Sequence, residues 1–577
     1  MVYLKQLAIG FSLLTLPFFS ATAETKAQEK MKSHLDVIKN ILDAAYAPCF
    51  WKESQFGWNL DIEISLAKRK VDENSKINDA QFQKIVRDFF SGMRDQHSFA
   101  RFHATEEAEL PFLVKGANNR YFISHINKGC LASSVYQISI GDELVIFDDK
   151  KTHDAVLDLQ KEISQEFQEG ANRALAEMFL TNRKRCYGHE VPKDPVKIGI
   201  KKRDSEKVRF YQLAWNYKPE CITSGYKIFQ GKDFSLKKEC PFKENRKETF
   251  FKQLMISSHY EFFENLRALS PECGHNPGAR KSFLGDLGKT WWVSSKKKTF
   301  HAYLYENDAG NLIGYIRIPH YSGSLGEVLE FAEIINLFEE RSDCLVIDQM
   351  NNPGGSLFYM CALTALLTEQ PLEVPKHQIA LNQSEIAEAI KAIPIFEEVS
   401  NDEEAIQLLG ESFYGNPVTF QTIQFVLNYF RFLVDEWNQG KTLTSPTYLY
   451  GFDQINPSPF GFYSKPILVL VNELSISAAE FFPAILQDNK RATIMGAKTS
   501  GAGGFVLKAN FPNLFGLKDF RYTGSIALRK KGDPIENLGV SPDVLYKISE
   551  EDLQCGYCVY SQEINAQVQE LIEKDHR

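Results

Sequence analysis

The sequence predicts an α/β protein built from more than one domain, and three observations carry that prediction. The chain has 577 residues, which is more than one hydrophobic core usually supports, so two to four domains are expected. From Tyr303 onward, short apolar runs alternate with helical patterns, which is typical of an α/β core. Before that core, residues 110 to 225 contain several short strand-like runs, which predict a small β-rich unit.

Composition narrows the class of protein further. Hydrophobic residues make up 44% and charged residues 24% of the chain, as in an ordinary globular protein. The net charge of -8 argues against nucleic acid as a partner. No cluster of metal ligands and no phosphate-binding loop is evident, so no metal and no organic cofactor is expected. The ten cysteines are scattered, and the Cys555–Cys558 spacing fits either coincidence or one local disulfide.

The first 23 residues differ from the rest of the chain. Lys5 is their only charge, an apolar run follows, and Ala21-Thr22-Ala23 fits a small-x-small cleavage site. This pattern predicts a secretory signal peptide, with a mature chain that begins at Glu24. A membrane anchor is the less favoured alternative, because the apolar run is short. No later stretch is long and apolar enough to span a bilayer, so the mature chain should be soluble, in a compartment left open.

Residues 24 to 108 are expected to form a helical N-terminal region. Apolar residues at helical spacing predict helices over Met31–Ala47 and Gln81–Met93. The second helix leads into the polar sequence Asp95-Gln96-His97-Ser98. A histidine in such a loop is usually a solvated side chain, but a serine nucleophile would need a base of this kind.

Residues 109 to 225 are expected to form a PDZ-like domain. Strands are predicted at Pro111–Val114, Tyr121–Ile126 and Glu143–Phe147. The sequence Ile140-Gly141-Asp142-Glu143-Leu144 resembles the signature of PDZ domains, with an aspartate or lysine where a turn glycine is usual. That resemblance implies a groove that binds an extended peptide by strand addition. The alternative is an unrelated small β-domain.

Residues 226 to 298 are expected to be a linker or an exposed insertion. Lysines crowd this segment together with cysteines, prolines and glycines. The alternative is a regular helix over Glu248–Leu269, packed on a neighbouring element.

The α/β core is expected over residues 299 to 560, with a helical insertion at 376 to 445 and a tail at 561 to 577. Its predicted strands and helices are Ile313–Ile318, Gly326–Phe338, Cys344–Asp348 and Leu357–Leu367. A sharp turn, Asn351-Asn352-Pro353-Gly354-Gly355, follows the second of these strands.

A strand, Ile467–Val471, precedes the candidate nucleophile. After a short turn, a helix is expected to start at Ser477, and a second strand leads into the loop Gly496–Gly504. A serine at such a turn exposes its hydroxyl, and free N–H groups at the helix start can hold an oxyanion. The alternative is an ordinary serine that caps the helix.

Together, in this order, the serine turn, the Asn-Asn-Pro-Gly-Gly turn and the motif Gly539-Val540-Ser541-Pro542-Asp543 resemble the tail-specific (C-terminal processing) serine peptidases. The resemblance covers Tyr303–Val544 and implies a core related to crotonase, with a PDZ domain upstream.

One departure from that family concerns the catalytic base. Many members place a lysine in the loop after the serine, whereas Ala502 stands at that position here, and Lys498 and Lys508 are out of register. The sequence Asp95-Gln96-His97-Ser98 resembles instead the motif of the histidine-using branch, which includes the tricorn core and the chlamydial protease-like activity factor. Further runs, such as Ile535-Glu536-Asn537-Leu538-Gly539-Val540, resemble the latter.

This resemblance implies a role for each site residue. Ser477 would be the nucleophile, His97 its base and Glu536 the group that orients the histidine. The oxyanion would be held by the N–H of Ala478 and by an N–H of Gly354 or Gly355. The enzyme would be an exported serine endopeptidase acting on proteins or peptides, with a role in virulence.

The resemblance also implies a zymogen that cuts itself within residues 226 to 298, and a homodimer. Two alternatives stay open. One is a catalytically inactive peptide- or ligand-binding protein on the same core. The other is an enzyme that uses Lys498 or Lys508 as its base.

Overall fold

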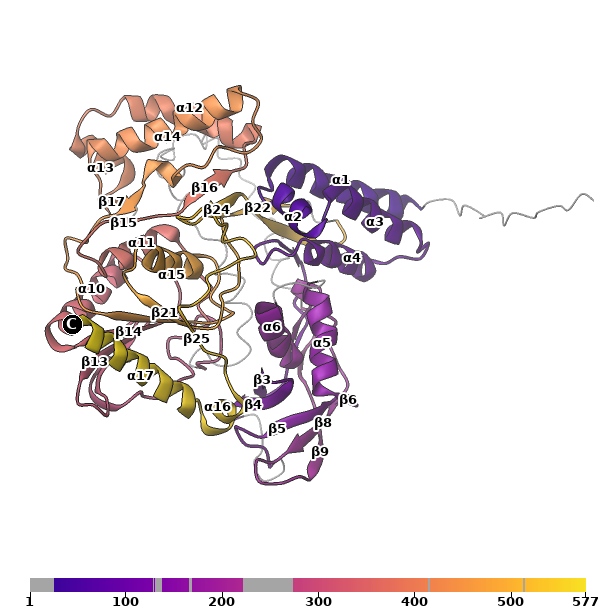
Figure 1. Ribbon diagram of the computed structural model, residues 1–577. Helices are drawn as coiled ribbons and strands as arrows, with labels where there is room; N and C mark the ends of the chain where they lie inside the picture. Colours follow the sequence, from indigo (N-terminus) through magenta and orange to yellow (C-terminus); the bar gives the residue numbers. More distant parts are fainter. Residues whose placement is uncertain are drawn as a thin grey trace, which may run out of the picture.

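The computed structural model describes residues 25–127, 129, 137–164, 169–221, 273–413, 416–511 and 514–576. The predicted signal peptide and most of the segment 226–298 therefore lie outside the described residues. Figure 1 shows an N-terminal group of helices (indigo), a β-rich unit below it (purple) and a larger α/β core beside both.

The core is built on a seven-stranded sheet of order β11-β12-β13-β14-β20-β21-β25. Strands β11 to β13 are antiparallel, and β13 to β25 are parallel. The bounds are β11 Lys289–Val293, β12 His301–Glu306, β13 Leu312–Arg317, β14 Cys344–Asp348, β20 Ile467–Val471, β21 Thr493–Gly496 and β25 Val544–Leu545. Strand β11 thus joins the sheet ten residues before the expected core boundary at 299.

Helices cover both faces of this sheet. Alternate residues of β20 serve the two sides: Val469 packs with α10, α11 and α15, whereas Leu468 packs with α17. The bounds are α10 Leu325–Arg341, α11 Leu357–Ala365, α15 Ala478–Asp488, α16 Glu550–Cys555 and α17 Cys558–Asp575. Because α17 holds one sheet face, the segment expected as a tail is part of the packed core (Figure 1).

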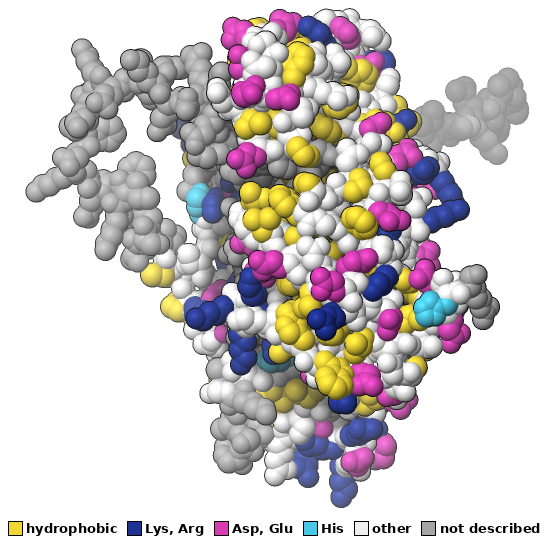
Figure 2. All heavy atoms as spheres, turned by 90° about the vertical axis from the view of Figure 1, so that its left-hand side faces the viewer, with side chains coloured by type: hydrophobic (Ala, Val, Ile, Leu, Met, Phe, Trp, Pro, Cys, Tyr) yellow, Lys and Arg dark blue, Asp and Glu magenta, His cyan; other side chains and the backbone are white. Residues whose placement is uncertain are grey.

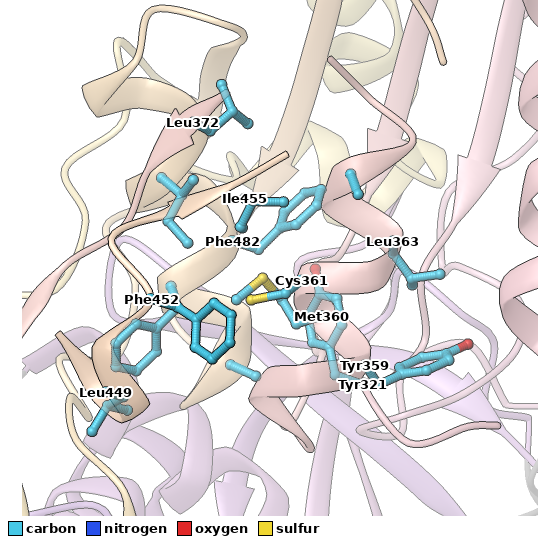
Figure 3. Packing of buried hydrophobic residues seen from close by; sticks show 14 of the residues in the cluster. Tyr321, Tyr359, Met360, Cys361, Leu363, Leu372, Leu449, Phe452, Ile455 and Phe482 are labelled. Carbon is cyan, nitrogen blue, oxygen red and sulfur yellow. The ribbon is translucent and has the colours of Figure 1, made fainter. Parts of the chain in front are cut away.

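Helix α15, which begins directly after Ser477, rests on a dense aromatic and aliphatic cluster. Figure 3 shows Phe482 of α15 beside Ile455, with the side chains of α11 below. The rings of Phe482 and Tyr321 lie 5.7 Å apart between centroids. Phe482, Ile455 and Tyr321 are all buried, so α15 has little freedom to shift relative to the sheet.

A helical insertion follows β16 and packs against the same cluster. Its elements are α12 Gln383–Glu397, α13 Asp402–Leu409 and α14 Phe420–Asn438, with short strands β17 Ser412–Phe413 and β18 Asn416–Pro417. The other short elements are β15 Leu372–Glu373, β16 Lys376–Ile379, the 3₁₀ turn Leu449–Gly451, β19 Gln454–Ile455 and β24 Ser525–Leu528. The face of the molecule in Figure 2 carries acidic, basic and hydrophobic side chains interspersed.

The β-rich unit is a sheet of order β3-β4-β5-β8-β9, with β6 paired to β5 and helices α5 and α6 packed on it. Its bounds are β3 Phe112–Ala117, β4 Arg120–Ile126, β5 Glu143–Phe147, β6 Lys150–Lys151, α5 Thr152–Ile163, α6 Glu169–Thr181, β8 Val196–Lys201 and β9 Val208–Leu213. A second small sheet joins β2 Glu107–Glu109, β7 Asn182–Lys184 and β10 Asn216–Lys218, beside the 3₁₀ turn Arg185–Tyr187. Asp148 and Asp149 both adopt positive φ, which aspartate tolerates and which explains the missing turn glycine.

The N-terminal helices share a core with strands from the far end of the chain. They are α1 Lys26–Ala45, α2 Cys49–Phe56, α3 Leu60–Asp72 and α4 Asp79–Gly92. Strand β1 Phe99–Phe102 pairs with β23 Leu517–Thr523, which pairs with β22 Val506–Asn510. Phe520 and Tyr522 of β23 pack among the helices. The loop that precedes β1, which carries His97, is thereby fastened to the C-terminal part of the core.

The structure settles one smaller expectation. Cys555 and Cys558 form a local disulfide between α16 and α17. Cys344 is a buried free thiol in β14.

Candidate active site

Ser477 lies at a strained turn between β20 and α15. Its φ is 61° and its ψ is -123°, and its side chain makes no capping hydrogen bond to the helix that begins at Ala478. A capping serine would have extended backbone and would accept a bond from the first helical turn. A non-glycine residue at positive φ is uncommon and requires surrounding structure to hold it. The geometry therefore differs from an ordinary helix cap and resembles a nucleophile turn.

The glycine turn after β14 packs directly on this serine. A Cβ on Gly354 would lie 2.5 Å from the carbonyl oxygen of Ile476 and 2.7 Å from the Cβ of Ser477. The N–H of Gly354 donates to Oδ1 of Asn352 at 2.8 Å. Within the described ranges, the N–H groups of Gly355 and Ala478 donate to no protein acceptor. These two amides are the ones open to a developing oxyanion.

His97 lies in the loop between α4 and β1 and is completely buried. Asp95 organises this loop, because its carboxylate accepts three hydrogen bonds. The donors are the His97 N–H at 2.8 Å, the Ser98 hydroxyl at 2.8 Å and the Thr523 hydroxyl of β23 at 2.7 Å. A cavity of about 110 Å³ borders the loop between α4 and the β-rich unit, with Asp95 and Ser98 in its wall.

Glu536 lies in the loop after β24 and is also completely buried. Its Oε1 accepts a hydrogen bond from Nζ of Lys52, a residue of α2. The same ammonium donates to Oδ1 of Asn537 at 2.6 Å and to the carbonyl oxygen of Arg94 at 2.9 Å. Nδ2 of Asn537 donates to that carbonyl as well, at 2.7 Å. Lys52 and Asn537 thus join the histidine loop to the Glu536 loop.

The glycine-rich loop links Glu536 to the serine helix. Glu480 of α15 accepts hydrogen bonds from the Thr499 hydroxyl at 3.0 Å, the Gly501 N–H at 2.8 Å and the Ala502 N–H at 2.5 Å. The carbonyl of Gly501 in turn accepts the Asn537 N–H at 2.7 Å. One run of contacts therefore connects the helix of Ser477, the loop 499–504, Glu536 and the histidine loop.

The buried charges set the protonation states in this region. Burial lowers the pKa of His97 to about 4, with Asp95 acting in the opposite direction. The imidazole is therefore neutral at neutral pH and able to accept a proton. Burial and the charge of Asp95 raise the pKa of Glu536 to about 8, against the effect of Lys52. The pKa of Asp95 is lowered, because Lys52, His97 and the two hydroxyl donors outweigh its burial. The neighbouring carboxyl groups of Asp95 and Glu536 therefore lose their protons at widely different pH values.

The lysines considered as alternative bases lie elsewhere. Ala502 is buried in the loop at the position where many family members have lysine. Lys498 is exposed, and Nζ of Lys508 lies 3.8 Å from a carboxylate oxygen of Asp519. The buried lysine next to the histidine loop is Lys52, which comes from α2.

Sequence reasoning missed Lys52 and Asn537. The sequence signal for Lys52 was weak, because it is one lysine in a short amphipathic helix and its acceptor Glu536 is 484 residues away. Asp95 was visible in the histidine motif, but its three hydrogen bonds could not be read from the sequence. Over the described ranges, no group of three or more His, Cys, Asp or Glu side chains could hold a metal ion.

Comparison with known proteins identifies the family of this chain. The sequence pattern of the PDZ domain matches residues 106–228, and that of peptidase family S41 matches residues 312–546. An uncharacterised protein of Chlamydia muridarum is 33% identical over 98% of this chain and 97% of its own length. The chain belongs to peptidase family S41 and is a serine protease with a PDZ domain.

Solved structures identify a particular relative. The crystal structure of mature CPAF, the chlamydial protease-like activity factor, is 30% identical, covers 96% of this chain and 99% of its own, and has a TM-score of 0.81. A structure of mature CPAF complexed with lactacystin covers 95% of this chain and 100% of its own, with a TM-score of 0.80. The resemblance suggested by the sequence motifs, and the fold it implied, are confirmed.

Proposed function

We propose that this serine protease is a secreted endopeptidase that uses Ser477, His97 and Glu536 as its catalytic triad. The observation that carries the proposal is the backbone of Ser477, which is held at positive φ without a capping bond. Such strain persists only where the surrounding structure maintains it, and it clusters at functional sites. His97 and Glu536 belong to loops connected to the helix of Ser477 by the contacts described above.

In the proposed reaction, Oγ of Ser477 attacks the scissile carbonyl carbon while His97 takes the hydroxyl proton. The carbonyl π electrons move to the oxygen, and the N–H groups of Ala478 and Gly355 hold that oxyanion. Gly354 is the less suitable donor, because its N–H already bonds Asn352. The C–N bond then breaks, and His97 gives its proton to the leaving amine. Water repeats the sequence on the acyl-enzyme, with Glu536 supporting the imidazolium each time.

The zymogen part of the proposal rests on accessibility. His97 and Glu536 are completely buried, and Ser477 is only 8% exposed. A protein substrate cannot reach these side chains in this form, so activity requires a rearrangement. Self-cleavage within 226–298 followed by dimer formation is the rearrangement that the resemblance to CPAF suggests.

Secretion rests on the N-terminal sequence pattern. That segment lies outside the described residues, and no helix among the described residues is long and apolar enough to cross a membrane. Tracking the mature N-terminus by mass spectrometry after expression in the native cell tests this part. Cleavage after Ala23 supports export, whereas a retained Met1 contradicts it.

The test of the triad uses residues 24–577 as wild type, Ser477→Ala and His97→Ala. Peptide hydrolysis, intact mass over several hours and labelling by a serine-directed phosphonate are measured together. We expect Ser477→Ala to lower kcat by about 10⁶-fold and to abolish labelling. We expect wild type to cut itself within 226–298 while Ser477→Ala stays whole.

Other outcomes would redirect the proposal. Hydrolysis retained by Ser477→Ala would contradict the nucleophile. Activity retained by His97→Ala would favour a lysine base. An intact, unlabelled wild-type chain would favour a binding protein on the same core.

A further inference from the structure

Lys52 is a completely buried lysine that no catalytic role yet explains. It lies on α2, whose neighbouring residues Glu53, Ser54 and Gln55 are exposed. Burying an ammonium group is costly unless its donors are paired. An ammonium has three N–H donors, and Lys52 has three acceptors: Glu536 Oε1, Asn537 Oδ1 and the Arg94 carbonyl. The hydrogen-bonding capacity of this buried group is therefore fully used.

The acceptors belong to two loops that meet only in the folded protein. Arg94 begins the loop of His97, and Glu536 and Asn537 lie in the opposite loop. Asn537 strengthens the joint, because its amide both accepts from Lys52 and donates to the Arg94 carbonyl. Nε1 of Trp51 also donates to Oδ1 of Asn537, at 3.1 Å. Removing the ammonium would leave the two loops joined mainly through the amide of Asn537.

We propose that Lys52 is a positioning residue of the protease, which clamps the histidine loop to the Glu536 loop and holds a positive charge against the Glu536 carboxyl group. This inference rests on the triad proposed above, because Lys52 acts through Glu536. The ammonium of Lys52 places a fixed positive charge next to the Glu536 carboxylate. In the proposed triad, that carboxylate supports His97 when His97 becomes an imidazolium. Without the ammonium, a larger fraction of Glu536 would be the neutral acid, which stabilises such a cation poorly.

The charges around Glu536 give the direction of the effect. Asp95 from the histidine loop and Glu480 from α15 raise the pKa of Glu536, and Lys52 from α2 lowers it. Tyr46, at the end of α1, faces both Asp95 and Glu536, and burial keeps its pKa raised, so it stays neutral. Lys52 is thus the cation that opposes two carboxylates here, and its loss must raise the pKa of Glu536 further.

His97 is affected by a similar set of charges. Asp95 raises the pKa of His97, whereas Lys52 and Arg521 lower it. Loss of Lys52 would raise the pKa of His97 from about 4, a change that lies below the pH range in which Glu536 titrates. The two effects therefore appear at different pH values and can be separated.

The experiment is a pH profile of kcat/KM from pH 6 to 10 for wild type, Lys52→Met and Lys52→Arg. Lys84→Met, at an exposed lysine of α4, is the matched control. We expect the acid-side midpoint, near pH 8 in wild type, to move up by about one unit or more in Lys52→Met. Activity at pH 7 should fall about tenfold or more, and the loss should shrink at high pH. Lys52→Arg should keep the wild-type midpoint, because the charge remains.

A double-mutant cycle tests whether Lys52 acts through Glu536. In a Glu536→Gln background, Lys52→Met should leave the pH dependence of kcat/KM unchanged, because no carboxylate remains to be ionised. Any loss of kcat that remains in this background measures the clamp through Arg94 and Asn537. The double variant also lacks the Glu536 carboxylate, which Lys52→Met alone would leave buried without its cation. The test therefore stays valid if Lys52→Met alone fails to fold.

Two results would overturn the inference: an unchanged midpoint in folded Lys52→Met, or the same change of the pH profile in both backgrounds. Ser477→Ala, assayed in parallel, distinguishes the two proposals. If it retains activity, the triad itself is wrong. If it is inactive while the Lys52 variants match wild type, only the inference fails.

Discussion

The two sides of the active site are held in different ways. On the serine side, neutral amides fix the backbone: the Asn351 N–H donates to Asn472 Oδ1, and Asn472 Nδ2 donates back to Asn351 Oδ1, each at 2.8 Å. On the histidine side, charged groups carry the structure, namely Lys52, Asp95 and Glu536. The difference implies that the turn of the proposed nucleophile depends less on pH than the proposed base and its supporting carboxylate.

One charged contact reaches the serine side, from the PDZ domain. Nζ of Lys115 in β3 lies 2.6 Å from Oε1 of Glu473, in the turn that precedes Ser477. The same lysine lies 3.5 Å from Glu177 of α6, and Leu474 and Ile476 pack into the core of the PDZ domain. The serine turn is therefore supported from two domains, mostly through neutral contacts.

The largest effect on kcat is expected from a substitution on the serine side, and it would sharpen this comparison. Gly354→Ala places a methyl group against Ile476 and Ser477, within 2.7 Å of both. Displacing the nucleophile by such a clash should lower kcat by about 10²-fold or more. The pH midpoint should not change, because the displaced contacts are neutral.

Gly310→Ala is the matched control for this prediction. Gly310 has a φ of 84°, close to the 87° of Gly354, but a Cβ there would meet nothing within 4 Å. It should suffer the same backbone strain without the clash. An equal loss of kcat in both variants would show that the close packing on Ser477 is unimportant.

An intermediate effect is expected from Asp95→Asn. The amide keeps an oxygen for the His97 N–H and faces two hydroxyl groups that can accept from it. Removing the charge should lower the pKa of Glu536, so the acid-side midpoint of kcat/KM should move to lower pH by about one unit. This shift is opposite in sign to that of Lys52→Met. Shifts of the same sign in both variants would contradict the assignment of that limb to Glu536.

The smallest effect concerns stability. The pKa of Glu536, raised to about 8, lies above 4.5, the value of an unfolded glutamate carboxyl. The folded state therefore binds this proton more tightly than the unfolded state. Stability should fall as pH rises between these values, by about 1.4 kcal/mol per pH unit for each such group. Glu480, whose pKa burial raises to about 7, adds to this loss up to its own pKa.

Chemical denaturation from pH 5 to 8.5 measures this slope. Glu536→Gln should reduce it, while Glu388→Gln, on the exposed surface of α12, should leave it unchanged. A wild-type stability that rises over this range would contradict the buried, raised pKa. We therefore expect the enzyme to gain activity and to lose stability as the pH rises over the same interval.

Much of the architecture could be predicted because its signals are local. Strands Cys344–Asp348, Ile467–Val471 and Glu143–Phe147 appear at their predicted bounds, since apolar β-branched runs mark buried strands. The Ser477 turn and the glycine turn were also visible as motifs. By contrast, the pairing of β1 with β23 joins Phe99 to Arg521 across the whole core, and periodicity carries no information on such distant partners. The same limit hid Lys52, whose burial depends on residues from the end of the chain.

The separation between Lys52 and Glu536 has a consequence for biosynthesis. A ribosome makes roughly 5–20 residues per second, so the 484 residues between them take at least about 24 seconds to appear. During that time the histidine loop lacks its clamp, strand β1 lacks its partner and Ser477 has not been made or has no complete base. Under the proposed triad, a nascent chain therefore has no assembled active site with which to digest itself or its neighbours. The order of the chain delays proteolytic activity until synthesis is nearly finished.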